Sequence, residues 1–208
     1  MSNLDQFKSE VARLFFSLSA SDGYLLAGGG ALLAGGFSNR PTEDLDFFGH
    51  RTTRDMAIVS RIFELAASRK GWRIQPIRRS EDFVRLRVQG AETIAVDFCR
   101  DSPATLPINR TIDGPAFSGP ELGGRKLLAL FSRAEARDFV DVYVLARSFG
   151  KEVLFAHAKQ LDAGFAVQPL CEAIQRLALY DDADLPIDQT LVAELREFFR
   201  SWTAELTA

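Results

Sequence analysis

The pattern of apolar and polar positions divides the chain into a first part with mixed periodicity and a second part with helical periodicity. In the first part, apolar residues spaced three to four apart predict helices at residues 4–18 and 53–68. Alternating or short apolar runs predict strands at residues 24–27, 45–48, 72–77, 83–88 and 93–98, with a short helix beginning near residue 31. We therefore expect a sheet with flanking helices in this part.

In the second part, every apolar pattern has helical spacing. It predicts helices at residues 122–132, 136–148, 153–161, 170–179 and 191–202. A connector rich in proline and glycine, residues 103–124, separates the two patterns. The sequence therefore predicts an α+β protein with two domains, residues 1–110 and residues 111–208, of which the second is a helical bundle.

The composition is that of an ordinary globular chain, and it narrows the chemistry. Of the 208 residues, 47% are hydrophobic, enough for one large core or two smaller ones. The apolar stretches are shorter than the ~20 residues of a membrane span, and no leader pattern opens the chain, so we expect a cytoplasmic protein with no membrane partner. Two cysteines without metal-type spacing and only two histidines favour carboxylate chemistry.

The net charge of −3 conceals a basic segment at residues 51–87, where ten basic side chains face four acidic ones. Such a local excess attracts polyanions. Alternation over residues 83–88 places Arg85 and Arg87 on one face of a strand. We name Arg78, Arg79, Arg85 and Arg87 as candidates for RNA binding, while a solvated helix and strand edge explains the same charges equally well.

Three glycines, Gly28, Gly29 and Gly30, lie between a predicted strand and a short helix. Glycine lets the backbone approach a ligand without a side chain in the way, and the first amides of the helix can receive an anion. We therefore expect this turn to bind nucleotide phosphates. A tight strand-to-helix turn without a ligand is the plainer interpretation of the glycines alone.

Asp44 and Asp46 are two residues apart on a predicted strand, so both carboxylates leave the same face while Leu45 points into the core. A hard cation such as Mg²⁺ would remove the repulsion between them. Arg40 is a further candidate contact to the nucleotide, or else it pairs with these carboxylates at a solvated strand end.

Asp97 comes near the end of another predicted strand, on the same side as Thr93 and Ala95. If that strand lies beside the one that carries Asp44 and Asp46, three carboxylates converge on one or two Mg²⁺ ions. The third carboxylate would then also help to deprotonate an attacking hydroxyl. A strand-end carboxylate without a ligand is the alternative.

The segment at residues 125–147 carries a second group of charged residues. Lys126 lies just inside one predicted helix, and Asp138 and Asp141 share a face of the next, with Arg137 in place for a pair with Asp141. Lys126 could hold nucleotide phosphates while Asp141 positions it or a substrate hydroxyl. A salt-bridged helix face is the ordinary explanation.

Taken together, these residues resemble the AbiEii/AbiGii-type nucleotidyltransferase toxins, including the MenT group, in the DNA polymerase beta-like superfamily. The resemblance runs roughly from residue 24 to residue 147. It rests on Gly28-Gly29, then Asp44-Leu45-Asp46-Phe47-Phe48, then Lys126-Leu127-Leu128-Ala129 through Arg133 to Arg137-Asp138-Phe139-Val140-Asp141. Two motifs in the right order, with an aspartate-bearing strand between them, are far more specific than either alone.

The resemblance implies a nucleotidyltransferase-type mixed sheet followed by a helical bundle, with the active site between the two lobes. It implies that Asp44 and Asp46 bind Mg²⁺, that Lys126 contacts the NTP, and that Asp141 is needed for activity. It also implies a toxin that transfers a nucleotide to tRNA 3′ ends, releases pyrophosphate and is controlled by a cognate antitoxin. One departure is Gly30, where many members of the family have Ser or Thr and so a hydroxyl for the phosphate.

Two other functions remain open at this point. The first is a nucleotidyltransferase that modifies a small cationic molecule such as an aminoglycoside, which the acidic second half of the chain favours and the basic segment opposes. The second is a non-catalytic module that binds RNA or a protein partner on the same fold. The nucleotide, the acceptor and the oligomeric state do not follow from the sequence.

Overall fold

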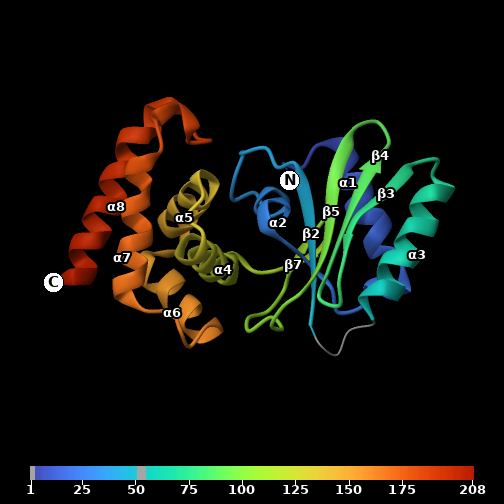
Figure 1. The fold of residues 1–208 in the computed structure, drawn as a ribbon, viewed down its shortest axis with the longest axis horizontal. Coiled ribbons are helices and arrows are strands. Elements are labelled where there is room, and N and C mark those ends of the chain that lie inside the picture. The colour runs from blue at the N-terminus through green and yellow to red at the C-terminus, as the bar shows by residue number, and fades with distance from the viewer. Residues whose placement is uncertain (1–2, 51–54) are drawn as a thin grey trace. The chain divides into compact units, whose positions relative to one another are not determined.

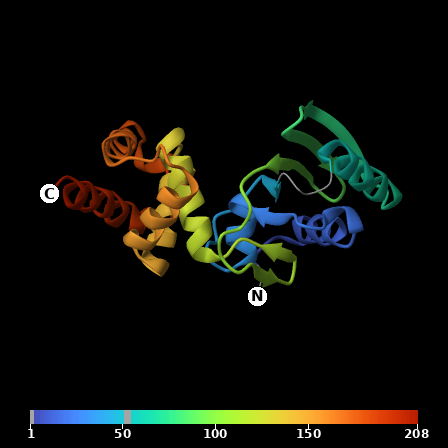
Figure 2. The same ribbon diagram turned by 90° about the horizontal axis from the view of Figure 1, so that it is seen from below.

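The computed structural model describes residues 3–50 and 55–208 and contains, within them, eight α-helices and a seven-stranded sheet, which confirms the expected α+β class (Figures 1 and 2). The chain forms two compact units, Met1–Ser118 and Gly119–Ala208. The sequence placed the boundary at residue 110. The structure keeps the next residues in the first unit because two short strands there join its sheet.

The sheet of the first unit has the strand order β3-β4-β5-β2-β1-β7-β6. Strands β2 and β5 are parallel, as are β1 and β7, and the other neighbours are antiparallel. The bounds are β1 Leu25–Ala27, β2 Asp44–Gly49, β3 Arg73–Arg79, β4 Phe83–Gln89, β5 Thr93–Arg100, β6 Asn109–Thr111 and β7 Gly114–Ala116. The first five lie within a few residues of the predicted strands. The sequence reasoning missed β6 and β7.

Three helices belong to the first unit: α1 (Gln6–Phe16), α2 (Gly28–Ala34) and α3 (Met56–Arg69), with a 3₁₀ turn η1 (Ser19–Ser21). Helix α2 begins at the first glycine of the triplet, not near Ala31 as predicted. The side chain of Asp55 caps α3 by accepting from the amides of Ala57 and Ile58. The predicted start of that helix at residue 53 lies outside the described residues, as do Arg51 and Arg54 of the basic segment.

One face of the sheet packs on α1 and α3 through aromatic side chains. Phe15 of α1 lies 4.3 Å from Phe47 of β2 and 5.2 Å from Phe98 of β5, measured between ring centroids. Phe63 of α3 lies 5.7 Å from Phe98, and all four rings are fully buried. Since side chains alternate along a strand, the neighbours of Phe47 and Phe98 in sequence point to the opposite face of the sheet.

The second unit is entirely helical in Figures 1 and 2. Its helices are α4 Gly119–Ser132, α5 Ala136–Phe149, α6 Lys151–Leu161, α7 Val167–Gln175 and α8 Val192–Thr207, with 3₁₀ turns η2 Arg176–Leu179, η3 Asp182–Asp184 and η4 Gln189–Leu191. The predicted helix at residues 170–179 is thus split between α7 and η2. Helix α4 contacts α5, α6 and α7, and its buried Leu127 and Leu130 form the centre of this bundle.

Asp138 secures the start of α5. Its buried carboxylate accepts two hydrogen bonds from Arg133, both 2.8 Å, and one from the Glu135 amide, which completes a capping box. We expect Asp138→Ala to lower the free energy of unfolding by about 2–3 kcal/mol, because it removes the side-chain acceptor of the Glu135 amide and both 2.8 Å hydrogen bonds from Arg133.

Urea denaturation measures this loss. Glu197→Ala is the matched control, since its carboxylate pairs with Arg200 on the exposed surface of α8, and such pairs contribute about 0–1 kcal/mol. Equal losses in the two variants would show that Asp138 has no special role.

Among the residues that the structure describes, no helix is long and apolar enough to cross a bilayer.

Candidate active site

Three carboxylates lie together on the face of the sheet opposite the aromatic core. Strand register places Asp46 of β2 directly beside Asp97 of β5, and beside Ala27 of β1 on its other side. Asp44 is two residues earlier on β2, so it shares the face of Asp46, while Leu45 between them is fully buried. The parallel pairing of β2 with β5 therefore produces the convergence that the sequence pattern left conditional.

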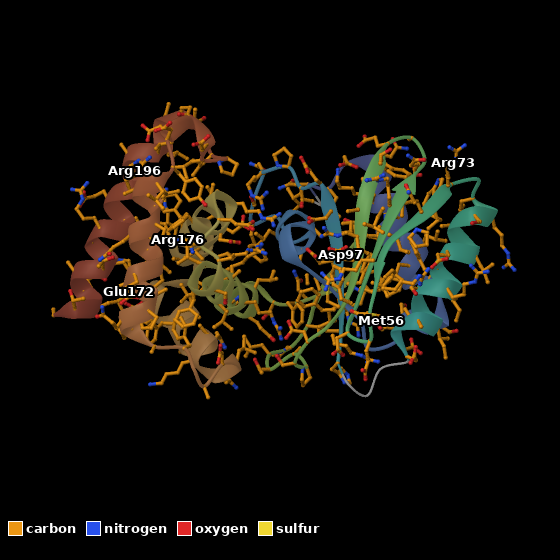
Figure 3. The ribbon with its side chains drawn as sticks, viewed as in Figure 1. Met56, Arg73, Asp97, Glu172, Arg176 and Arg196 are labelled. Carbon is orange, nitrogen blue, oxygen red and sulfur yellow. The ribbon has the colours of Figure 1, made fainter. Side chains whose placement is uncertain are left out.

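One oxygen from each of Asp44, Asp46 and Asp97 lies within 4.8 Å of the others. Twice a Mg²⁺–oxygen distance of about 2.1 Å is only slightly shorter, so small side-chain movements let all three reach one ion or share two. All the donors are carboxylate oxygens, which hard cations such as Mg²⁺ prefer. The set therefore fits a divalent cation. Asp97 is labelled on β5 in Figure 3.

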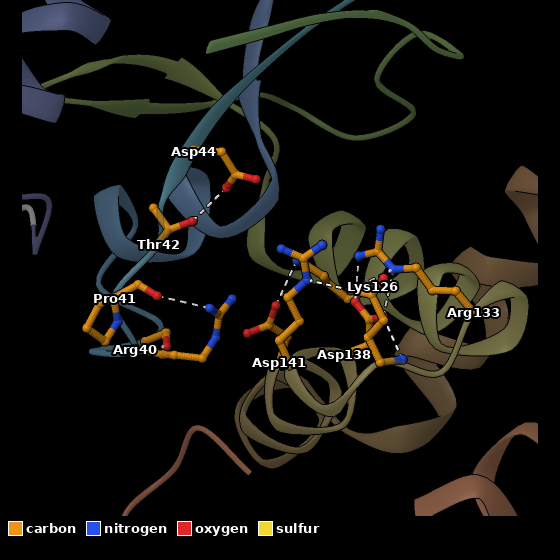
Figure 4. Close-up of polar contacts among 11 residues, drawn as sticks. Arg40, Pro41, Thr42, Asp44, Lys126, Arg133, Asp138 and Asp141 are labelled. Atoms are coloured by element: carbon orange, nitrogen blue, oxygen red, sulfur yellow. Dashed lines mark hydrogen bonds and ion pairs between the residues drawn. The ribbon is translucent and has the colours of Figure 1, made fainter. Parts of the chain in front are cut away.

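A threonine outside the predicted site holds one of the carboxylates in place. Thr42, just before β2, is buried, and its hydroxyl donates to Asp44 Oδ1 at 2.8 Å (Figure 4). One oxygen of Asp44 therefore has a fixed direction. The sequence carried a signal for this contact, because two-residue spacing puts positions 42 and 44 on the same side of an extended chain.

The glycine turn lies against the same carboxylates. Gly28 has a φ of +57°, and a Cβ there would lie 1.8 Å from Asp46 Oδ2. Only glycine therefore permits both the backbone conformation and the position of Asp46. A Cβ on Gly29 would lie 2.7 Å from the Thr42 hydroxyl and 3.4 Å from the Arg40 guanidinium.

Gly30 faces the interior. A Cβ there would lie 2.9 Å from Leu45 Cδ2 and 3.5 Å from Leu26 Cδ1. A Ser or Thr at this position would therefore require Leu45 to give way. In this chain a side chain at position 30 conflicts with the packing beneath the turn, which is a physical reason for glycine.

Arg40 is half-buried in the segment before β2, where its guanidinium donates to the carbonyl of Pro41 at 3.0 Å (Figure 4). Its proximity to Gly29 places a positive charge next to the glycine turn. A ligand anion at the turn would therefore meet both backbone amides and a guanidinium.

Asp97 has an arginine partner that the sequence assigned elsewhere. Arg85 of β4 lies opposite Asp97 in the register, and it donates through Nε to Oδ1 at 2.8 Å and through a terminal nitrogen to Oδ2 at 2.5 Å. These hydrogen bonds and the negative charges of Asp97, Asp44 and Asp46 raise the pKa of Arg85 above its ordinary value. Arg85, a candidate for RNA binding, thus also pairs with the carboxylate cluster.

The four arginines named as RNA candidates do not share one face of the sheet. Arg78 lies opposite Arg85 in the β3–β4 pair and stacks over Phe83, and Arg87 donates to Gln75 at 3.2 Å. Arg79 bonds to Ser60 and Glu64 of α3, so it serves the packing of that helix. Arg78, Arg85 and Arg87 therefore form the basic part of the carboxylate face.

Lys126 and Asp141 form a buried ion pair within the second unit, 2.7 Å between Nζ and Oδ2 (Figure 4). Lys126 is 8% exposed and Asp141 1%. The two lie on different helices, α4 and α5, and their contact agrees with the expectation that Asp141 positions Lys126. Arg137, which we expected beside Asp141, bonds to Glu135 at 2.9 Å.

Several solved structures have a similar fold, among them the following two. MenT4, a nucleotidyltransferase toxin from Mycobacterium tuberculosis H37Rv, has a TM-score of 0.62 and 20% identity over 96% of this chain and 82% of its own. JHP933 from Helicobacter pylori has a TM-score of 0.63 and 18% identity over 98% of this chain and 95% of its own. The fold is therefore of the class found in nucleotidyltransferase toxins.

The family follows from the sequence itself. The profile of the family described as "Nucleotidyl transferase AbiEii toxin, Type IV TA system" matches residues 13–207. The chain belongs to this family of nucleotidyltransferase toxins, which confirms the resemblance drawn from the glycine, Asp-Leu-Asp and Lys–Asp motifs. No curated protein sequence matches the chain.

Proposed function

We propose that this protein transfers a nucleotide from an NTP to an acceptor hydroxyl and releases pyrophosphate, with Mg²⁺ held by Asp44, Asp46 and Asp97. The observation that carries the proposal is the convergence of the three carboxylate oxygens within 4.8 Å, beside a glycine turn that only glycine can form. Membership of the nucleotidyltransferase toxin family supports the same reaction.

The reaction forms a bond between the acceptor oxygen and the α-phosphorus and breaks the bond from that phosphorus to the pyrophosphate. When bound, a divalent cation stabilises the attacking and leaving oxygens of such an in-line displacement. The turn at Gly28, Gly29 and Gly30 and the guanidinium of Arg40 bind the phosphates that leave as pyrophosphate. One of the three carboxylates of Asp44, Asp46 and Asp97, here called the triad, accepts the proton of the acceptor hydroxyl.

Lys126 and Asp141 lie within the second unit, and the proposal gives each a role on the ground of the family's Lys–Asp motif. Lys126 contacts the nucleotide phosphates as a point charge, and Asp141 holds the ammonium in place through their 2.7 Å contact. Asp141 is thus a positioning residue. Its burial leaves it without solvent to stabilise its charge if Lys126 is removed.

A pair of variants separates the catalytic role of Lys126 from its structural role. We expect Lys126→Met to lose activity and about 3 kcal/mol of stability, because it removes the positive member of a buried ion pair and leaves the charge of Asp141 in place. Lys126→Met combined with Asp141→Leu should recover most of that stability, since an apolar pair of similar volume replaces the ion pair. Urea denaturation and a nucleotide-transfer assay measure the two quantities; recovery of activity in the double variant would show that Lys126 acts only through the fold.

The acceptor that we propose is the 3′ end of tRNA. The support is the family, together with the basic strip of Arg78, Arg85 and Arg87 on the carboxylate face, which suits a polyanion. A cytoplasmic location goes with such an acceptor. As a toxin of a type IV system, the protein would be counteracted by a cognate antitoxin.

The direct test is incubation with Mg²⁺, total tRNA and each α-labelled NTP in turn, with Asp46→Asn as the inactive control. We expect label on tRNA with at least one NTP, dependent on Asp46. Label on an added aminoglycoside but not on RNA would favour the small-molecule enzyme. No transfer to any acceptor, from protein that is folded, would favour a non-catalytic binding module.

A further inference from the structure

The Arg85–Asp97 contact has the geometry of a strong, specific ion pair. Both oxygens of Asp97 accept from one guanidinium, in a side-on arrangement with distances of 2.8 and 2.5 Å. The register of β4 and β5 sets the two residues directly opposite each other, so the strands themselves hold the pair in line. The guanidinium of Arg85 thereby occupies lone pairs of the Asp97 oxygens that Asp97 would need in order to bind a metal ion.

The ion pair also reduces the electrostatic repulsion among the three carboxylates of the triad. Three carboxylates whose oxygens lie within 4.8 Å repel one another, and Asp97 is almost completely buried, where solvent screens its charge least. The guanidinium of Arg85 supplies one positive charge at this point. It therefore stabilises the cluster without any bound ion.

The two partners differ in their freedom to move. The Asp97 side chain is short, sits on a central strand and is 4% exposed, whereas the Arg85 side chain is long, reaches the surface and is 43% exposed. If the contact opens, Arg85 is the partner that moves into solvent. Its planar fork is then free to bond to a phosphate oxygen.

We propose that Arg85 is a built-in counter-ion of the triad, which occupies Asp97 when no divalent cation is bound and competes with that cation for the Asp97 carboxylate. The inference rests on the proposed function, because it takes the triad to be the cation site. Arg85 is thus a positioning residue, since it acts through Asp97. When a divalent cation binds, it replaces the guanidinium of Arg85 at the buried carboxylate of Asp97.

Titration of the protein with Mn²⁺, measured by calorimetry, tests the competition without an activity assay. We expect Arg85→Gln to bind Mn²⁺ about tenfold more tightly than the unaltered protein, because a competing positive charge is gone. The Mn²⁺ affinity of Arg85→Lys should lie between those of the other two proteins, since an ammonium keeps the charge but cannot form the bidentate hydrogen bonds of a guanidinium.

Arg87→Gln is the matched control. It removes the same charge from the same face of β4, two residues away, but its guanidinium bonds to Gln75 instead of a carboxylate. We expect its Mn²⁺ affinity to change by less than about threefold, because a charge at greater distance and exposure is screened.

Thermal unfolding supplies a second readout. In the presence of a chelator, Arg85→Gln should unfold at a temperature about 4 °C below that of the unaltered protein, because the buried Asp97 has lost its partner. Saturating Mn²⁺ should narrow or reverse this difference. A purely structural role for Arg85 predicts a difference that Mn²⁺ leaves unchanged.

Three results would overturn the inference. Unchanged or weaker Mn²⁺ binding by Arg85→Gln would mean that Arg85 does not compete for the site. An equal gain in Arg87→Gln would assign the effect to general charge and not to the contact with Asp97. If the unaltered protein shows no Mn²⁺ binding that depends on Asp46, the cation site of the proposed function fails as well, and the two failures are thereby distinguished.

Discussion

Replacing Asp46 by Asn should reduce nucleotide transfer by about a thousandfold or more. Asp46 is the central member of the carboxylate row, with Asp97 beside it on β5 and the glycine turn against its other side. An amide cannot supply the charge that holds a divalent cation, and such an ion contributes several kcal/mol of transition-state stabilisation, each 1.36 kcal/mol being tenfold in rate.

The same substitution should leave the fold intact. Asn has the shape of Asp, and removing one charge from a crowded carboxylate cluster relieves repulsion. Pyrophosphate release measures the activity, and circular dichroism with thermal unfolding measures the fold. Asp22→Asn, at an exposed position in the same unit, is the control and should retain full activity. Activity in Asp46→Asn equal to that of Asp22→Asn would refute the catalytic assignment.

Gly28→Ala should impair both stability and transfer. The φ of +57° costs an L-residue about 1–2 kcal/mol, and the new Cβ would lie 1.8 Å from Asp46 Oδ2, so either the turn or the carboxylate must shift. We expect a loss of about 2 kcal/mol or more in the free energy of unfolding. Transfer should fall about a hundredfold, because a displacement near 1 Å of a catalytic group has that effect.

Gly71→Ala isolates the backbone cost. Gly71 has a φ of +82°, and its Cβ would meet no other atom within 4 Å. This variant should lose about 1 kcal/mol of stability and no activity. Urea denaturation and the transfer assay, run on both variants, give the comparison. If Gly28→Ala behaves like Gly71→Ala, the turn does not determine the position of Asp46.

Much of the first unit could be predicted because its elements have strong local patterns. The alternation around Asp44 and Asp46 predicted that both carboxylates lie on one face of β2. The alternating burial along the strand in the structure agrees with this prediction. Strands β6 and β7 were missed because each is only three residues long, too short to show a periodicity, and β7 also contains glycine and proline. Their place in the sheet comes from pairing β7 with β1, which is a long-range contact.

The partners of the site residues were harder to predict than the residues themselves. Alternation placed Arg85 on a face of β4, but only the register with β5 sets it opposite Asp97. The register depends on the length and geometry of the turn between the strands, which a hydrophobic pattern does not specify. For Asp141 the sequence offered two partners, Arg137 by helical spacing and Lys126 by motif, and the packing of α4 against α5 selects Lys126.

The central claim is that Asp44, Asp46 and Asp97 together hold the divalent cation on which transfer depends. Anomalous diffraction from crystals of the protein grown with Mn²⁺ and a non-hydrolysable NTP tests it most directly. The account predicts an anomalous peak coordinated by these three carboxylates and by nucleotide phosphate oxygens. A peak elsewhere in the molecule, or bound nucleotide with no Mn²⁺ at the triad, would contradict it.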